Sequence, residues 1–122
     1  AEDQKAQVAR LKTACLLNRA LCLLKVNNFK KALKTCNSVL DVESHNAKAL
    51  FRRAQAFLGL EDCAQALRDA KAVLEVDPRN PDVRRLLAQV KERQALLDSN
   101  SKELFEKMCG GLGGLPHPLD VD

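Results

Sequence analysis

This chain has no tryptophan and no tyrosine, and four phenylalanines are its only aromatic residues among 122. Proteins that bind single-stranded nucleic acids stack the bases on aromatic rings. Such a small number of rings argues against a nucleic-acid surface, although four lysines lie close together at Lys25, Lys30, Lys31 and Lys34. We interpret these lysines as a solvated basic face and expect no nucleic acid among the partners.

Glycine and proline are scarce before Gly110, whereas alanine, leucine and lysine are abundant. This composition favours helix nearly throughout, and no segment resembles a strand. We therefore predict an all-α protein of one compact domain.

Long apolar runs are also missing, and every run is far shorter than the roughly 18 residues that span a bilayer. The N-terminus has no basic-then-apolar signal pattern. We expect a cytoplasmic chain with no membrane partner. Because it begins at Ala1 without a methionine, we also expect it to be part of a longer protein.

The cysteines and histidines do not form a recognisable site. Five cysteines are an odd number without C-x-x-C spacing, and the two histidines, His45 and His117, are far apart. This pattern fits neither a zinc site nor a disulfide framework, and no cysteine has a nearby base to activate it. The glycines from Gly110 to Gly114 follow a helix instead of preceding one, so they are not a phosphate-binding loop. We predict no metal, no cofactor and no catalytic residue.

An internal repeat is the strongest positive feature of the sequence. Residues 47–80 repeat the pattern of residues 13–46, and this offset equals the period of the tetratricopeptide repeat. Small and apolar residues recur at this spacing, where two helices must touch. The matched pairs include Leu16 and Leu50, Ala20 and Ala54, Ala32 and Ala66, Cys36 and Ala70, Val39 and Val73, Leu40 and Leu74, and Asn46 and Asn80.

The repeat predicts two helix-turn-helix units and a long capping helix. The expected helices cover residues 3–25, 29–42, 47–60, 63–76 and 81–108. Asn80 should cap the fifth helix, with Pro81 at its first position. The predicted units are residues 1–46, residues 47–80 and a capping helix over 81–109, which together form a repeat domain over 1–109, followed by a glycine-rich flexible tail over 110–122.

The first predicted helix is longer than a repeat helix needs to be. Its core candidates are Leu11, Cys15, Ala20 and Leu23. A stacked array normally needs about three units, so we also expect apolar side chains of this helix to be uncovered. Self-association through this helix is one consequence we consider.

Charge is unevenly distributed along the chain. Residues 1–60 hold eleven Lys and Arg against four Asp and Glu, whereas residues 61–122 hold nine against twelve. The basic half should attract an acidic partner.

Three polar residues on the first helices of the units are the candidate binding site. Lys48 and Arg52 are four residues apart and therefore share one helix face, where two like charges disfavour the helix. Asn18 occupies the repeat position of Arg52, one unit earlier. Donors of this kind, converging on one concave face, suit a carboxylate ligand. The alternative is a solvated basic face.

Four segments resemble the repeat domain of large FKBP-type immunophilins and related co-chaperones. They are L-L-N-R-A-L-C-L-L-K, A-L-K-T-C-N-S-V-L, N-A-K-A-L-F-R-R-A-Q-A-F and the closing K-E-L-F-E-K-M. The resemblance covers residues 1–108 and corresponds to the second and third repeats of that domain.

In that family a carboxylate clamp grips the C-terminal Glu-Glu-Val-Asp peptide of ninety- or seventy-kilodalton heat-shock chaperones. The resemblance assigns Asn18, Lys48 and Arg52 to three of its five polar members and places the other two on a preceding repeat. It also implies a parent protein with a separate peptidyl-prolyl isomerase domain, while this chain itself is not an enzyme.

Alternative functions are a repeat scaffold that binds another acidic partner or itself, and a basic helical domain that binds nucleic acid. The chain ends in Leu119, Asp120, Val121 and Asp122, which is close to the peptide that such clamps bind. Insertion of the Asp122 tail into a neighbour's groove is therefore a second route to self-association.

Overall fold

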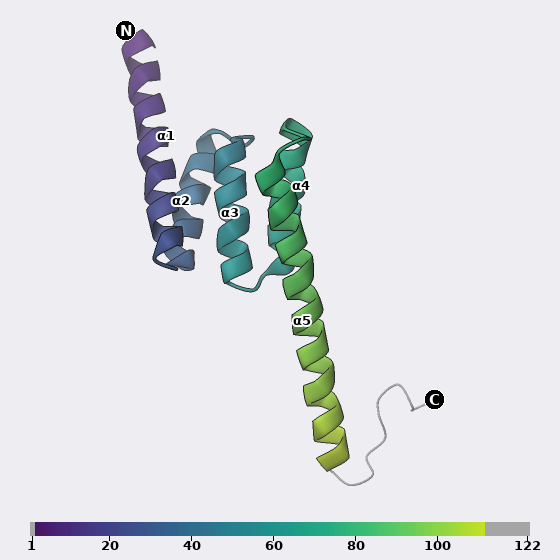
Figure 1. Cartoon of the computed structure of the whole chain (residues 1–122). Helices are drawn as coiled ribbons and strands as arrows, with labels where there is room; N and C mark the ends of the chain where they lie inside the picture. The colour runs from purple at the N-terminus through teal and green to yellow at the C-terminus, as the bar shows by residue number, and fades with distance from the viewer. Residues whose placement is uncertain (1, 112–122) are drawn as a thin grey trace.

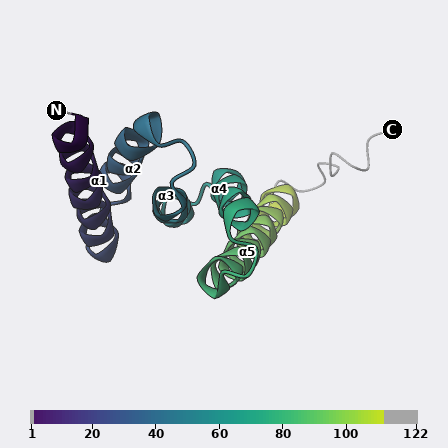
Figure 2. The ribbon, with the colours of Figure 1, turned by 90° about the horizontal axis from the view of Figure 1, so that it is seen from above.

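The chain folds into five helices and no strand over the residues that the structure describes. The computed structural model describes residues 2–111, so most of the predicted tail over 110–122 lies outside them. The helices are α1 Glu2–Lys25, α2 Phe29–Val42, α3 Ala47–Gly59, α4 Cys63–Val76 and α5 Pro81–Gly111. They lie beside one another in chain order (Figures 1 and 2). The all-α prediction is confirmed, and each observed helix end differs from the predicted one by at most three residues.

The helix starts repeat in the same register as the sequence. The Asn28 side chain accepts a hydrogen bond from the Lys31 amide at 3.4 Å, and Asp62, at the same position of the next unit, caps α4 in the same way. The Asn80 side chain accepts hydrogen bonds from the amides of Asp82 and Val83. These caps satisfy amides that the helix itself leaves unpaired, so the predicted cap at Asn80 is confirmed.

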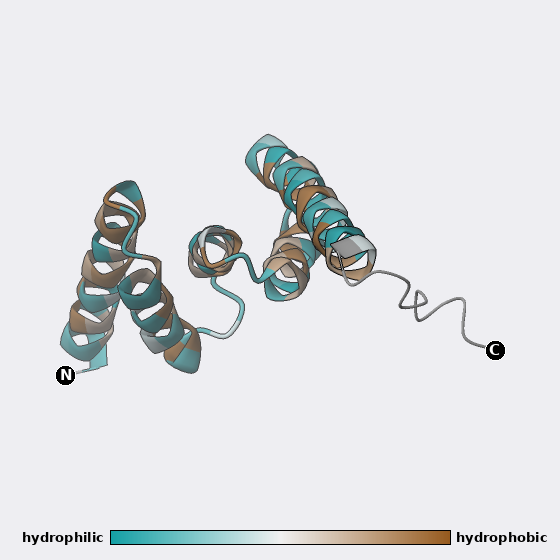
Figure 3. Ribbon diagram, turned by 90° about the horizontal axis from the view of Figure 1, so that it is seen from below, coloured by the Kyte–Doolittle hydropathy of each residue, from teal (hydrophilic) through white to brown (hydrophobic). Residues whose placement is uncertain are grey.

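The core consists of alanine, cysteine, valine and leucine side chains on the faces where the helices meet. Figure 3 shows that apolar residues occur along every helix. Four of the repeat-related pairs have nearly identical burial, as expected if each member makes the same inter-helix contact in its own unit. The pairs Ala20 and Ala54, Ala32 and Ala66, and Cys36 and Ala70 are fully buried, and Val39 and Val73 are each 1% exposed.

Two of the four core candidates on α1 are wrong. Ala20 is buried and Leu23 is half-buried, but Leu11 is 67% exposed and Cys15 is exposed as well. The N-terminal half of α1 projects past α2, so no described helix covers it (Figure 1). The expected uncovered apolar side chains of this helix are present at Val8 and Leu11.

Three of the four phenylalanines and two of the five cysteines pack within the fold. Phe51 and Phe57 pack against the core, and the ring of Phe29 lies directly against Gly59. Burial raises the pKa of the Cys36 thiol to about 11, which suits a small packed residue and not a nucleophile. Within residues 2–111, no helix is both long enough and apolar enough to cross a bilayer.

Candidate functional site

Helix α3 carries the two cations of the candidate site on one face. Asn46 fixes the start of α3, since its side chain accepts a hydrogen bond from the Ala49 amide at 3.0 Å. Lys48 therefore lies in the first turn and is exposed, and Arg52 lies one turn later and is half-buried. The N-terminal end of a helix also carries a partial positive charge that favours anions.

Arg52 connects α3 to α1. Its Nη1 donates a 2.8 Å hydrogen bond to the backbone carbonyl oxygen of Leu17. A carbonyl is neutral, so this bond fixes the guanidinium without cancelling its charge. Within residues 2–111, neither Lys48 nor Arg52 forms an ion pair with a carboxylate, which leaves both cations available for an anionic ligand.

The two cations line a hollow of about 350 Å³. Its walls come from α1, α3 and the start of α5. The lining residues are Leu21, Ala47, Lys48, Phe51, Arg52, Gln55, Asn80 and Asp82. The apolar and aromatic members can contact a side chain next to the bound carboxylate.

Asn18 does not line this hollow. It is exposed on α1 and directly follows Leu17, whose carbonyl accepts the Arg52 hydrogen bond. The structure thus brings Lys48 and Arg52 into one hollow, whereas Asn18 is not among the residues that line it.

Further hollows extend this site along α3. One of about 310 Å³ shares Phe51, Gln55 and Asp82 with the first hollow. A third of about 450 Å³ shares Gln55, Leu86 and Gln89 with the second. We call this continuous row of hollows the α3 groove.

The sequence analysis did not identify the two glutamines of the α3 groove. Gln55 and Gln89 are separated by one repeat period and so occupy one repeat position. Gln55 also lies on the face of Lys48 and Arg52, at the i, i+4, i+7 spacing. Both signals were present in the sequence. A glutamine amide offers a donor and an acceptor, as the backbone of an extended peptide requires.

One acid lies among the groove residues. Asp82 lines the same hollow as Lys48 but is ion-paired with Arg85, three residues later on α5. This pairing offsets part of the repulsion that Asp82 exerts on an acidic ligand.

Arg53, the neighbour of Arg52, forms hydrogen bonds between helices and does not line the groove. Its Nε and Nη2 donate to the two carboxylate oxygens of Asp69 at 2.7 and 2.8 Å, and its Nη1 donates to Asn37 at 3.1 Å. The hydrogen bonds to Asp69 raise the pKa of the Arg53 guanidinium above its usual range. Arg53 therefore joins α3 to α2 and α4, and only Arg52 of this pair faces the groove.

Comparisons with known proteins agree with this architecture. Residues 23–90 match the family described as tetratricopeptide repeat. Human peptidyl-prolyl cis-trans isomerase FKBP4 is 38% identical over 107 residues, which are 88% of this chain and 23% of the relative. The mouse protein of the same name is 32% identical over 120 residues, 98% of this chain and 26% of the relative. The chain thus spans about a quarter of the length of these relatives.

Solved structures with the same fold include peptide complexes. The first repeat domain of Spaghetti (RPAP3), bound to the HSP90 peptide SRMEEVD, has a TM-score of 0.65 at 26% identity over 68% of this chain and 66% of that chain. The second repeat domain of human RPAP3, in complex with the HSP70 peptide SGPTIEEVD, has a TM-score of 0.62 at 28% identity over 65% and 66%.

Proposed function

We propose that this chain, which belongs to the tetratricopeptide repeat family, is a co-chaperone module that binds the acidic C-terminal peptide of heat-shock chaperones. The observation that carries the proposal is the pair Lys48 and Arg52, two cations that face one groove and have no acidic partner among residues 2–111. The similar structures that hold peptides ending in Glu-Glu-Val-Asp support this ligand class. The repeat is a protein-interaction fold and not a catalytic one.

In this proposal the terminal carboxylate of the peptide lies between Lys48 and Arg52. The Lys48 ammonium acts as a point charge, and the Arg52 guanidinium uses the N–H groups that it does not donate to Leu17. In the proposal Asn18, the residue after Leu17 on α1, donates its amide N–H to the same peptide end. Such charge-assisted hydrogen bonds are about twice as strong as neutral ones.

The α3 groove is long enough for several peptide residues. The 13 residues of α3 span about 20 Å at about 1.5 Å per residue. An extended peptide of about six residues covers this distance at about 3.3 Å per residue. The amides of Gln55 and Gln89 then lie beside the backbone of the peptide upstream of its terminal acid.

The same comparisons support a proposal for the longer protein that holds this chain. We propose that the chain is part of a longer cytoplasmic immunophilin with a separate isomerase domain, because its relatives are isomerases four times its length. In the family that it resembles, the two remaining clamp groups belong to a preceding repeat. We therefore expect this chain to bind the peptide more weakly than a five-membered clamp would.

The test is a titration of the chain with a free-acid peptide ending in Glu-Glu-Val-Asp and with its C-terminal amide. The amide should not bind. Lys48→Ala and Arg52→Ala should each weaken binding of the acid about tenfold or more, since a hydrogen bond to a charged group contributes about 1.5–3 kcal/mol. Added salt should weaken binding further.

Lys34→Ala is the matched control, because Lys34 is an exposed lysine on α2 outside the groove. Circular dichroism of each variant confirms that the fold is retained. Equal binding of acid and amide, or an effect of Lys34→Ala as large as that of Lys48→Ala, would contradict the proposal. If the parent chain binds neither peptide, the groove of this chain does not serve a peptide carboxylate.

A further inference from the structure

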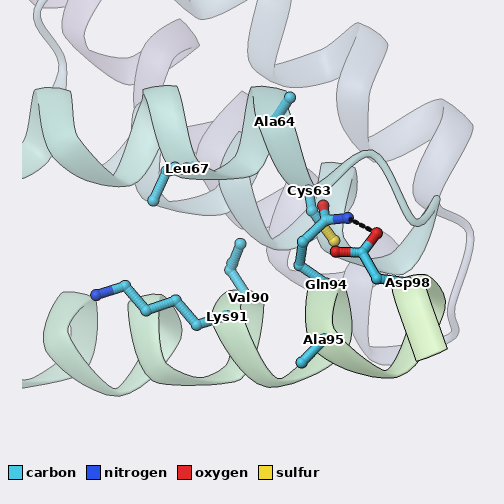
Figure 4. A pocket seen from close by; sticks show the side chains of 8 residues that line it. All are labelled: Cys63, Ala64, Leu67, Val90, Lys91, Gln94, Ala95 and Asp98. Carbon is cyan, nitrogen blue, oxygen red and sulfur yellow. Dashed lines mark hydrogen bonds between the residues drawn. The ribbon is translucent and has the colours of Figure 1, made fainter. Parts of the chain in front are cut away.

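A further hollow, separate from the three that form the α3 groove, lies on the opposite side of α5 from that groove. It has a volume of about 490 Å³ and lies between α4 and α5 (Figure 4). Cys63, Ala64 and Leu67 of α4 form one wall, and Val90 and Ala95 lie on the α5 side. Three polar residues of α5 complete the lining, and one of them, Gln94, donates to Asp98 at 2.9 Å. The hollow is therefore apolar with polar groups from one helix only.

The repeat explains why a hollow exists here. Helix α3 packs between α2 and α4, the second helices of the two units. Its counterpart one repeat later is α5, which packs against α4 and α3. In its unit, α3 is covered on one side by α4, the second helix of that unit. Within residues 2–111 no second helix follows α5, so the equivalent side of α5 is not covered.

The distal half of α5 carries an apolar stripe that continues the packed face of that helix. Val83, Val90, Leu97 and Leu104 follow one another at seven-residue steps. Val83 and Val90 are buried against α4, and Leu97 is partly buried, whereas Leu104 is 60% exposed. Met108, one turn after Leu104, is 57% exposed. Figure 1 shows this half of α5 projecting past the other helices, and Figure 3 shows that apolar segments recur along it.

We propose that the occupant of the α4–α5 hollow is the distal half of α5 from a second copy of this chain. The exchange is reciprocal, so that two copies form a dimer with a two-fold axis near Ala95. In an array, a second helix runs antiparallel to the first helix of its unit. A two-fold axis across α5 imposes this direction on the partner's helix, which makes the contact self-complementary and closed.

The length of the distal half fits this role. Residues 96–111, the distal half of α5, make 16 residues, close to the 14 of α2 and of α4. The partner's distal half can therefore lie along the whole of α4, in the place of the missing second helix. Small residues at the crossing point, Ala64 and Ala95, allow the helices to approach closely.

Charge also fits a second copy. Lys91 and Asp98 both line the hollow and lie at nearly equal distances on either side of Ala95. An antiparallel crossing centred there places Lys91 of each copy opposite Asp98 of the other, twice in the dimer. Seven residues separate them within one chain, about 10 Å along the helix at about 1.5 Å per residue, and within residues 2–111 they do not form an ion pair with each other.

The dimer leaves the α3 groove open. Gln89 and Arg93 line the groove side of α5, while Lys91 and Ala95 line the hollow. The proposal therefore does not depend on the proposed function, and a failure of peptide binding would not affect it.

The test is the mass of the whole 122-residue chain in solution by sedimentation equilibrium over a range of concentrations. The expected species is a reversible dimer of twice the 13.5 kDa chain mass. Leu104→Glu and Ala95→Arg should each raise the dimer dissociation constant about tenfold or more, because Ala95 lies near the proposed axis and Leu104 is an exposed leucine that the partner's α4 would bury. Leu11→Glu, at a similarly exposed leucine on α1, is the matched control and should change nothing.

A charge exchange tests the pairing of the copies directly. Lys91→Asp and Asp98→Lys should each weaken the dimer, and the double variant should restore it. A chain that is monomeric at all concentrations overturns the proposal, and so does a trimer or larger species, since a two-fold contact closes at two copies. A dimer broken by Leu11→Glu and not by Leu104→Glu would also overturn it and would assign self-association to α1.

Discussion

Arg53 of α3 and Asp69 of α4 form a two-pronged salt bridge with unequal exposure. The Nε–Oδ2 distance is 2.7 Å and the Nη2–Oδ1 distance is 2.8 Å. The Arg53 side chain is 25% exposed and the Asp69 side chain only 3%. The carboxylate therefore depends on the guanidinium, whereas the guanidinium still reaches water.

Because the Asp69 side chain is more buried than the Arg53 side chain, removing Arg53 and removing Asp69 should lower the free energy of unfolding by different amounts. Arg53→Met leaves a buried carboxylate without a cation and should lower the free energy of unfolding by about 3 kcal/mol or more. Asp69→Asn leaves a guanidinium that is partly solvated, and we expect a loss of about 1–2 kcal/mol. Urea denaturation of both variants measures the two losses. Equal losses would show that the burial of Asp69 does not decide the energetics of the pair.

Gly59 is predicted to resist substitution because of Phe29. A Cβ atom at Gly59 would lie 2.3 Å from Cε1 of the Phe29 ring, which is too close for any contact. Gly59→Ala should therefore lower stability by about 1–3 kcal/mol, the usual cost of overpacking. The matched control is Gly110→Ala on α5, where a Cβ would meet nothing within 4 Å. This variant should be as stable as the parent or slightly more stable, because alanine has a higher helix propensity than glycine.

Thermal denaturation compares these two glycine variants. Phe29→Leu combined with Gly59→Ala should recover part of the loss, because the smaller side chain removes the ring atoms that clash. Additive effects of the two substitutions would mean that the ring is not the cause.

Cys36 should be the least reactive of the thiols on the repeat units. Burial raises its pKa to about 11 from an ordinary value of 9.0, while Cys15 and Cys22 are exposed on α1. At pH 8 we expect alkylation of Cys15 and Cys22 in the folded chain and alkylation of Cys36 only after denaturation in urea. Mass spectrometry of the labelled peptides distinguishes these sites.

The same pKa predicts a dependence of stability on pH. The folded state holds the Cys36 proton more tightly than the unfolded state does. The protonated thiol therefore contributes its full stability below pH 9, and this contribution is lost as the pH rises from 9 to about 11. Cys36→Ala, which copies the residue at Ala70 one repeat later, should show a shallower loss of stability over that range. Parallel curves for the two proteins would contradict the prediction.

The sequence predicted the helices well because the repeat and the caps act locally. The repeat period brings Asn46 into register with Asn80, and each of these residues caps a helix in the structure. The spacing from Lys48 singles out Arg52 in the K-A-L-F-R-R segment, but the sequence predicts no partner for either of the two arginines. Their separation into a groove residue and a salt-bridge residue depends on Asp69 and Leu17, which are distant in sequence. Leu11 was predicted to be buried because its apolar spacing is correct, but burial also requires a covering helix.

The glutamines of the α3 groove give the last prediction. If an extended peptide lies along α3, Gln55 exchanges hydrogen bonds with its backbone, and Gln55→Leu should weaken binding of the free-acid peptide by about 1 kcal/mol, or roughly fivefold. Because an amide carries no charge, this variant should keep the salt dependence of the parent, whereas Lys48→Ala should reduce it.

Gln94→Leu is the matched control for Gln55→Leu. Gln94 is an amide of α5 that lines the α4–α5 hollow, and at about 100° per residue it lies about 140° around the helix from Gln89. Isothermal titration calorimetry should show no change for Gln94→Leu, and a loss for Gln89→Leu similar to that for Gln55→Leu. If both groove variants bind as the parent does, the peptide is held at its terminal carboxylate only, and the length of the groove plays no part in recognition.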